Sequence, residues 1–190
     1  MDFVNLKVAG KAVTRVVKRC DLAKQNKKLD LSQCLLHSFP EAIFFILRET
    51  NCFDCNLSQN LLKSIPAKFG LKFKFLVSLD LSRNNLTTLP ESLREITQLR
   101  RIDISCNSFN DLPSVIFGFK KLTHLNAQQN YIQELEHIDD LTKLEHLQMV
   151  NLLTNPFNEV TYKRLKEIRK FLIILSPQEE TARLHRLEQL

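Results

Sequence analysis

The feature that most constrains the fold is a short apolar pattern that recurs along most of the chain. Its clearest copy covers residues 76–90, where Leu79 and Leu81 alternate with polar residues before the chain turns at Asn84. Successive side chains of a strand point to opposite faces, so both leucines face the same side of a short strand. The copy therefore predicts a strand, a turn and a return of the chain to the same core.

This pattern occurs six times at a nearly constant period. The turn residues Asn84, Asn107 and Asn130 are spaced 23 residues apart. A less regular first copy has Cys34 at the turn, and the second and sixth copies have Asn60 and Asn155 there. Units of this length stack into a solenoid, because one unit alone buries too little apolar surface to offset its backbone entropy. We expect the turn amides to bridge backbone groups that the turns leave unpaired.

The pattern LxxLxLxxNxL resembles the leucine-rich repeat family over roughly residues 26–160. The resemblance implies an α/β fold, namely a right-handed solenoid with a parallel sheet on the concave side and helical or irregular segments on the convex side. Residues 155–168 also resemble the C-terminal cap of cytosolic and nuclear members of the phosphatase-regulator and spliceosomal types. They depart from it where residues 170–175 read KFLIIL instead of containing Leu-Pro-x-Leu. We expect one domain, with a helical cap over 1–28, six repeats over 29–160, and a helical cap and tail over 161–190.

Between the predicted strands, the convex side should carry one or two helical turns per repeat. A proline stands where each of four short helices could start, at a position that needs no hydrogen-bond donor. These prolines are Pro40, Pro66, Pro90 and Pro113.

The N-terminal segment predicts an amphipathic helix that covers the open end of the core. Residues 3–24 place Leu6, Ala9, Val13, Val16, Val17 and Cys20 at near-helical spacing, although the β-branched residues between 13 and 17 leave a strand as the alternative. Residues 1–28 hold eight Lys or Arg and two acids, a net charge equal to the +6 of the whole chain. This charge is either a solvated helix face or a basic face for an acidic partner, nucleic acid or an anionic membrane.

The C-terminal segment predicts a closing helix and then a second helix. Tyr162, Leu165, Ile168 and Leu172 fit one face of the first. Residues 176–179 read Ser-Pro-Gln-Glu, which is typical of a helix N-terminus with a capping box.

Five cysteines raise the question of a metal or redox site. The spacing of Cys52 and Cys55 could hold half a zinc site, but these residues occupy the core positions that Leu76 and Leu79 take in the next repeat. We interpret both as core residues and expect no metal. Cys106 is expected on the exposed strand face.

The compartment is inferred from the N-terminus and the cysteines. Lys7, Lys11 and Arg15 interrupt the segment that would be apolar in a signal peptide, and no apolar run reaches the length of a membrane span. The paired-cysteine clusters of secreted family members are missing. We expect a cytoplasmic protein, with the nucleus as the alternative location, and no secretion.

Catalytic motifs are equally scarce. The sequence has no HExxH, no nucleophile elbow and no glycine-rich phosphate loop, and its five histidines have no fixed spacing. We therefore expect neither an enzyme nor a cofactor.

The concave face is the predicted binding surface. One row shared by the repeats is polar (Asp30, Asn56, Asp80, Asp103, Asn126, Asn151), and a second row follows it (Ser32, Ser58, Ser82, Ser105, Gln128, Leu153). Local hydrogen bonding explains both rows. Exposed Arg and aromatic residues are frequent anchors of interfaces. The residues that differ between repeats are therefore the candidate partner-binding residues, namely Phe53, Asp54, Arg83, Arg100, Arg101, His124 and Met149.

The sequence thus predicts a monomeric, non-catalytic interaction scaffold that binds a protein partner. The alternative is a ribonucleoprotein or nucleic-acid accessory protein that uses the basic N-terminal helix. Acids stand among the basic residues of the concave face, and such mixed signs make a poor phosphate track.

Overall fold

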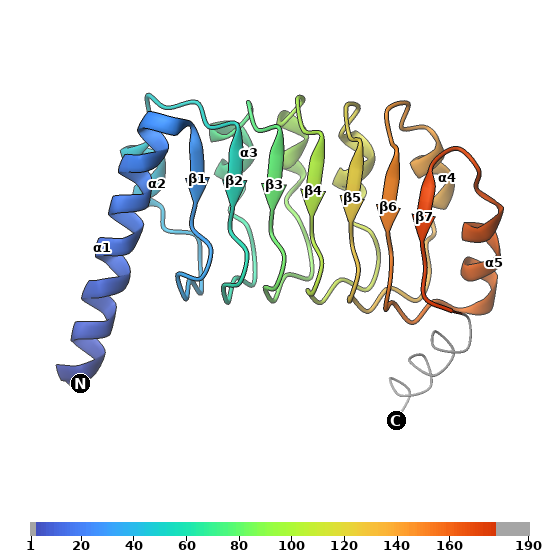
Figure 1. Ribbon diagram of the computed structural model, residues 1–190, viewed down its shortest axis with the longest axis horizontal. Coiled ribbons are helices and arrows are strands. Elements are labelled where there is room, and N and C mark those ends of the chain that lie inside the picture. The colour runs from blue at the N-terminus through green and yellow to red at the C-terminus, as the bar shows by residue number, and fades with distance from the viewer. Residues whose placement is uncertain (1–2, 178–190) are drawn as a thin grey trace.

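The computed structural model describes residues 3–177, with side chains described from residue 13 onward. Seven short strands lie side by side in one parallel sheet and follow one another in sequence order (Figure 1). Six of them fall in the predicted repeats, and the seventh lies in the segment that we expected to be a helical cap. The strands are β1 (Lys28–Asp30), β2 (Asp54–Asn56), β3 (Ser78–Asp80), β4 (Arg101–Asp103), β5 (His124–Asn126), β6 (Met149–Asn151) and β7 (Leu172–Ile174).

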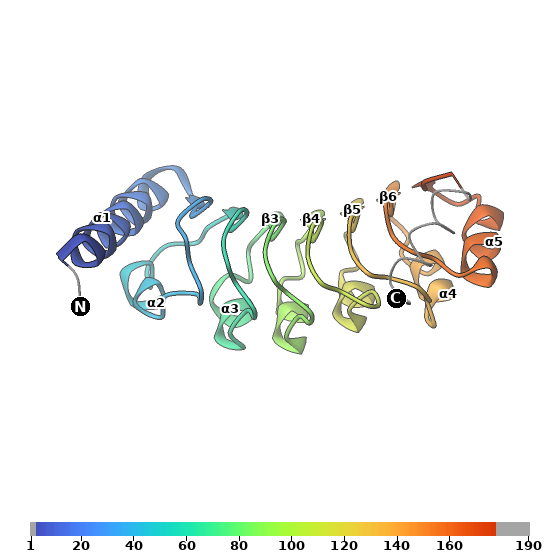
Figure 2. The same ribbon diagram turned by 90° about the horizontal axis from the view of Figure 1, so that it is seen from below.

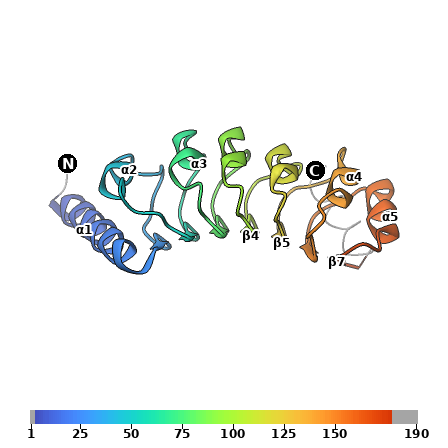
Figure 3. The ribbon, with the colours of Figure 1, turned by 90° about the horizontal axis from the view of Figure 1, so that it is seen from above.

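Short helices line the opposite side of the stack, which curves gently with the sheet on its inner side (Figure 2, Figure 3). Pro90 and Pro113 directly precede two of them, as predicted. Those two are 3-10 helices, whose tighter hydrogen bonding suits short segments. The convex helices are α2 (Ala42–Ile46), α3 (Lys68–Lys72), η1 (Glu91–Glu95), η2 (Ser114–Gly118) and α4 (Ile138–Thr142).

The strand register confirms the predicted polar row. The six residues from Asp30 to Asn151 stand opposite one another in neighbouring strands. In each repeat the side-chain oxygen accepts from the backbone N–H two residues later, as when Asp80 Oδ1 accepts from Ser82 at 2.9 Å. This local bond shapes the end of the strand, so the row has a structural role.

The turn asparagines join each repeat to the one before it. Asn84 Nδ2 donates to the carbonyl oxygens of Leu57 and Leu81, both at 3.0 Å, and its Oδ1 accepts from the N–H of Leu62 at 3.0 Å. The side chains of Asn60, Asn107, Asn130 and Asn155 form equivalent bonds. The predicted bridging role of the amide is confirmed.

The residue before each turn asparagine has a left-handed backbone. Gln59, Arg83 and Cys106 have φ between 54° and 56°, and their N–H groups donate to the next repeat. The expectation that Cys106 lies on the strand face was wrong, because it belongs to this turn, where its Sγ contacts Gln129 Oε1 at 3.0 Å.

Helix α1 (Phe3–Asn26) covers the open end of the stack beside β1 (Figure 1). Val16 and Cys20 are buried as predicted, and Ala23 is buried with them. Val13 and Val17, placed on the same face by spacing alone, are exposed. From residue 13 onward, the helix therefore packs through a narrow stripe of smaller side chains, and the side chains of Leu6 and Ala9 lie outside the described part.

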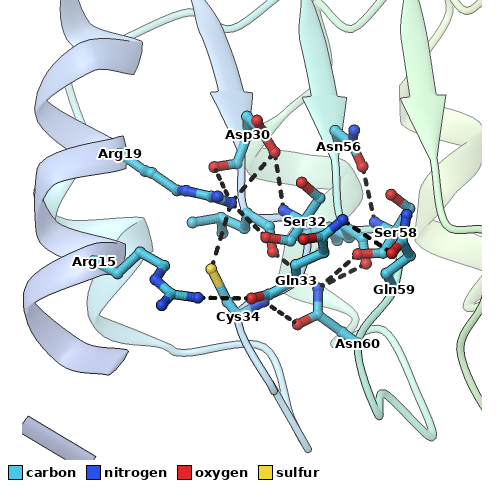
Figure 4. Close-up of polar contacts among 12 residues, drawn as sticks. Arg15, Arg19, Asp30, Ser32, Gln33, Cys34, Asn56, Ser58, Gln59 and Asn60 are labelled. Atoms are coloured by element: carbon cyan, nitrogen blue, oxygen red, sulfur yellow. Dashed lines mark hydrogen bonds and ion pairs between the residues drawn. The ribbon is translucent and has the colours of Figure 1, made fainter. Parts of the chain in front are cut away.

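Two arginines of α1 supply hydrogen-bond donors to the first repeat, which has no repeat before it (Figure 4). Arg19 Nη1 donates to the carbonyl oxygens of Asp30 and Ser32, and Arg15 Nη1 donates to that of Gln33 at 3.0 Å. One repeat later, Asn60 Nδ2 donates to Ser58, which occupies the place of Ser32. The guanidinium groups therefore satisfy carbonyls at the end of the stack that no asparagine reaches.

The C-terminal end combines helix α5 (Glu159–Glu167) with β7. Tyr162 and Leu165 are buried on this helix as predicted. The prediction was wrong for Leu172, because the helix ends at Glu167 and Leu172 begins β7, where its side chain is 59% exposed. An apolar, β-branched run suits a strand, and this one pairs with β6.

Ser176 stays within the repeat pattern. Its Oγ accepts from the N–H of Thr154 at 2.8 Å, and its carbonyl oxygen accepts from the Tyr162 hydroxyl. The predicted helix beyond it begins at the edge of the described residues and otherwise lies outside them. Within the described part of the chain, no helix has the length and apolar character needed to cross a membrane.

Candidate protein-interaction surface

The candidate surface lies where the chain enters the strands. We call it the leading edge and define it as the first residue of each strand from β2 to β7 together with the residue before each of β2 to β6. Backbone bonds hold these positions side by side: Phe53 accepts from Val77 at 2.7 Å, Val77 accepts from Arg100 at 2.8 Å, and Arg100 accepts from Thr123 at 2.8 Å. The leading edge consists of Phe53, Val77, Arg100, Thr123, Gln148, Asp54, Ser78, Arg101, His124, Met149 and Leu172.

Six of the seven predicted partner-binding residues lie on the leading edge. In the register, Asp54 stands opposite Ser78, Arg101 opposite His124, and His124 opposite Met149. Phe53 and Arg100 each come one residue before a strand. The structure brings these six residues to one edge of the sheet.

Arg83 does not belong to this group. It occupies the left-handed turn after β3, where its N–H donates to Ser105 beyond the far end of β4. The sequence placed Arg83 with Arg100 and Arg101 among the candidate residues of one surface. That placement was wrong, because Arg83 lies in the turn after β3 whereas the other two lie where β4 begins.

The leading-edge arginines are charged groups without a counter-ion. Within residues 13–177, no ion pair involves Arg100 or Arg101, and both are exposed. Lys28 and Asp54 pair at 3.9 Å. The neighbouring acid Asp103 is instead engaged locally, since its Oδ1 accepts from Ser105 and its Oδ2 from Asn126. The basic centre of the edge is therefore free for an outside partner.

Apolar side chains flank this basic centre. Phe53 is 48% exposed and Val77 is half-buried beside it, while Met149 is half-buried beside the exposed Leu172 at the other end. The repeat pattern of the sequence did not single out Val77 and Leu172 as surface residues. Leu172 was missed because β7 was assigned to a helix, and the apolar run from 171 to 175 was the signal that could have identified it.

The histidine of the edge is held by its neighbour. His124 is half-buried, and its Nδ1 lies 2.9 Å from the hydroxyl of Thr123. Thr123 in turn donates to the carbonyl oxygen of Arg100 at 2.8 Å. This chain of bonds fixes the ring beside the arginines.

The cysteines have no place at this surface. Cys20, Cys34, Cys52 and Cys55 are all buried in the core, which confirms the interpretation of Cys52 and Cys55 as core residues. Burial raises the pKa of the Cys20 thiol to about 11 and raises the pKa of the other three thiols as well. These thiols are therefore protonated and unreactive at neutral pH. Among the described residues, no cluster of three His, Cys, Asp or Glu side chains is placed to hold a metal ion.

The repeat geometry and the family comparison agree. The family model described as "Leucine rich repeat" matches residues 56–108 and 97–151, which together cover half of the chain. The chain belongs to the leucine-rich repeat family.

Individual relatives share parts of this region. A human protein, Leucine-rich repeat-containing protein 20, is 34% identical over 99 residues, which cover 50% of this chain and 54% of that protein. A probable disease resistance protein of Arabidopsis thaliana is 32% identical over 121 residues, which cover 62% of this chain and 13% of that protein. The chain thus spans about half of one relative and a small part of the other.

Solved structures show the same solenoid. A leucine-rich repeat protein of Leptospira interrogans superposes with a TM-score of 0.63 at 27% identity. The match covers 73% of this chain and 34% of that one.

Proposed function

We propose that this chain is a non-catalytic interaction module that binds a protein partner through the leading edge and the adjoining concave face of its sheet. Proteins of the family commonly mediate protein–protein interactions. The observation that carries the proposal is that exposed Arg100 and Arg101 have no counter-ion among residues 13–177 and share the leading edge with the exposed Phe53, two strands away. Arginine and aromatic side chains supply much of the binding energy at protein interfaces.

The remaining concave residues support binding without catalysis. The polar row from Asp30 to Asn151 is committed to shaping the strand ends, as the bond from Ser82 to Asp80 exemplifies. An intracellular scaffold, acting as a monomer in the cytoplasm or nucleus, fits five unpaired cysteines, four of which are buried. Thiols of this kind persist in a reducing compartment.

The nucleic-acid alternative draws less support from the N-terminal helix. Arg15 and Arg19 are bonded to carbonyls of the first repeat, and Lys24 pairs with Asp21 at 3.0 Å. Fewer cations of α1 are therefore free to follow a phosphate backbone.

Affinity capture with the full chain tests the proposal. Arg100→Glu combined with Arg101→Glu should abolish capture of the main interactor from cell extract while leaving Tm nearly unchanged, because exposed substitutions shift stability by only about 0.5 kcal/mol. Arg83→Glu is the matched control, since Arg83 is also exposed and lies outside the leading edge. Unchanged capture by the double variant would contradict the proposal.

A further inference from the structure

The side chains of the leading edge follow a definite order across the sheet, and this order deepens the proposed function on which the inference rests. Phe53 and Val77, at β2 and β3, are apolar. Arg100 and Arg101, at β4, carry the free positive charge, and His124 follows at β5. Met149 and Leu172, at β6 and β7, are apolar again. The one acid of the edge, Asp54, pairs with Lys28 at 3.9 Å, and Ser78, Thr123 and Gln148 are uncharged. The apolar and unpaired charged side chains of the edge therefore follow the order apolar, basic, apolar.

The spacing of the strands gives the length of the leading edge. Neighbouring strands lie about 4.8 Å apart, so the five intervals from β2 to β7 span about 24 Å. The arginines at β4 lie two intervals, about 10 Å, from Phe53 and three intervals, about 14 Å, from Leu172. An extended peptide advances about 3.4 Å per residue, so about seven residues would cross the whole edge.

The acids next to this edge restrict where a partner can place negative charge. Asp103 lies two residues after Arg101 on the same face of β4, and it stands opposite Asp80. A negatively charged group that moved from the arginines toward the strand centres would meet these carboxylates. A chain of evenly spaced phosphates therefore fits poorly, and a short acidic stretch confined to the arginines fits well.

We propose that the leading edge binds a peptide segment of a partner protein in which a short acidic stretch is flanked on both sides by apolar residues. The acidic side chains pair with Arg100 and Arg101. The apolar residues cover Phe53 and Val77 on one side and Met149 and Leu172 on the other. The charge gives specificity, and the two apolar contacts define the length of the segment.

Fluorescence anisotropy with synthetic nine-residue peptides tests the order directly. The first probe carries two Glu at the centre and a Leu near each end, separated by Ser. The second probe has Lys in place of Glu, and the third has the composition of the first with both Glu at one end and both Leu together. The first probe should bind at least about tenfold more tightly than either of the others. Equal affinity for the first and third probes, or preference for the second, would overturn the proposal.

Variants of the full chain locate the contact. Arg101→Glu should weaken the first probe by about tenfold or more, and added salt should weaken it in the wild type. Arg83→Glu, the control, should change affinity less than about twofold. An equal loss in both variants would show that net charge alone governs binding and would overturn the proposal.

The two experiments separate this inference from the proposed function. If the first probe shows no preference but the Arg100→Glu and Arg101→Glu variant still loses its interactor in extract, the peptide order is wrong and the binding surface stands. If capture in extract is unchanged, both are wrong.

Discussion

The side-chain amide of Asn107 donates to the carbonyl oxygen of Leu81 in the preceding repeat at 3.0 Å. The same nitrogen donates to Ile104 at 3.1 Å, and Oδ1 accepts from the N–H of Leu86 at 2.9 Å. One buried side chain thus satisfies backbone groups on two levels of the stack. The same bonds in successive repeats hold neighbouring repeats at a fixed offset, so the spacing of the asparagines in the sequence matches the register of the strands.

Asn107→Ala should therefore destabilise the protein strongly. It leaves several buried backbone groups without partners, at a cost of about 1–3 kcal/mol each, so we expect a loss of about 3 kcal/mol or more. Asn110→Ala is the control, because Asn110 is exposed outside the turn position. Chemical denaturation of both variants checks this, and equal midpoints would contradict the bridging role.

The hydrogen bonds of Arg19 in helix α1 lead to a second prediction about stability. Arg19→Met should cost about 2 kcal/mol, because the carbonyls of Asp30 and Ser32 lose a charged donor while the alkyl stem is kept. Lys18→Met changes a neighbouring exposed residue and should have little effect. Hydrogen exchange should accelerate at residues 28–34 in the first variant only. Unchanged exchange there would argue against capping by the guanidinium group.

Two glycines on the convex side differ in the space around them. A Cβ at Gly70 would lie 1.9 Å from the carbonyl oxygen of Ser92, whereas at Gly118 the nearest atom would be Cγ of the flexible Arg94 side chain, at 3.0 Å. Gly70→Ala should lower Tm by roughly 6–12 °C, because helix α3 must separate from η1, at a cost of about 3 kcal/mol. Gly118→Ala should shift Tm far less. A reversed ranking in calorimetry would contradict the close packing of these two helices.

The buried thiols predict a loss of stability at high pH. The pKa of Cys20 is raised by burial from 9.0 to about 11, so the folded protein keeps a proton that the unfolded chain releases above pH 9. Below pH 9 this group's contribution to stability is fully present, and it is lost as pH rises from 9 to 11, by about 1 kcal/mol at pH 10. Other groups also titrate between pH 9 and 11. The unfolding free energy of the wild type is therefore compared with that of Cys20→Ala at several values between pH 8 and 10. The difference between their unfolding free energies should shrink as pH rises, and a constant difference would contradict the buried thiol.

The sequence predicted the repeated parts of this fold well, because the same apolar spacing and turn asparagine occur in each copy. The ends were less predictable. The narrow buried stripe of α1 depends on how the helix meets β1, and β7 arose from a segment whose apolar spacing also suited a helix. The same holds for the candidate surface. The candidate residues within or next to the strands could be placed from the repeat spacing. Arg83 could not, because the left-handed turn after β3 moves it away from the leading edge.

The most direct test of the proposed binding surface is an amide NMR titration of the full, isotopically labelled chain with its captured partner. We expect the largest chemical-shift changes along the leading edge, at Phe53, Val77, Arg100 and Arg101, extending toward Met149. Changes concentrated on the convex helices or on α1, with these amides unmoved, would contradict the proposed binding surface.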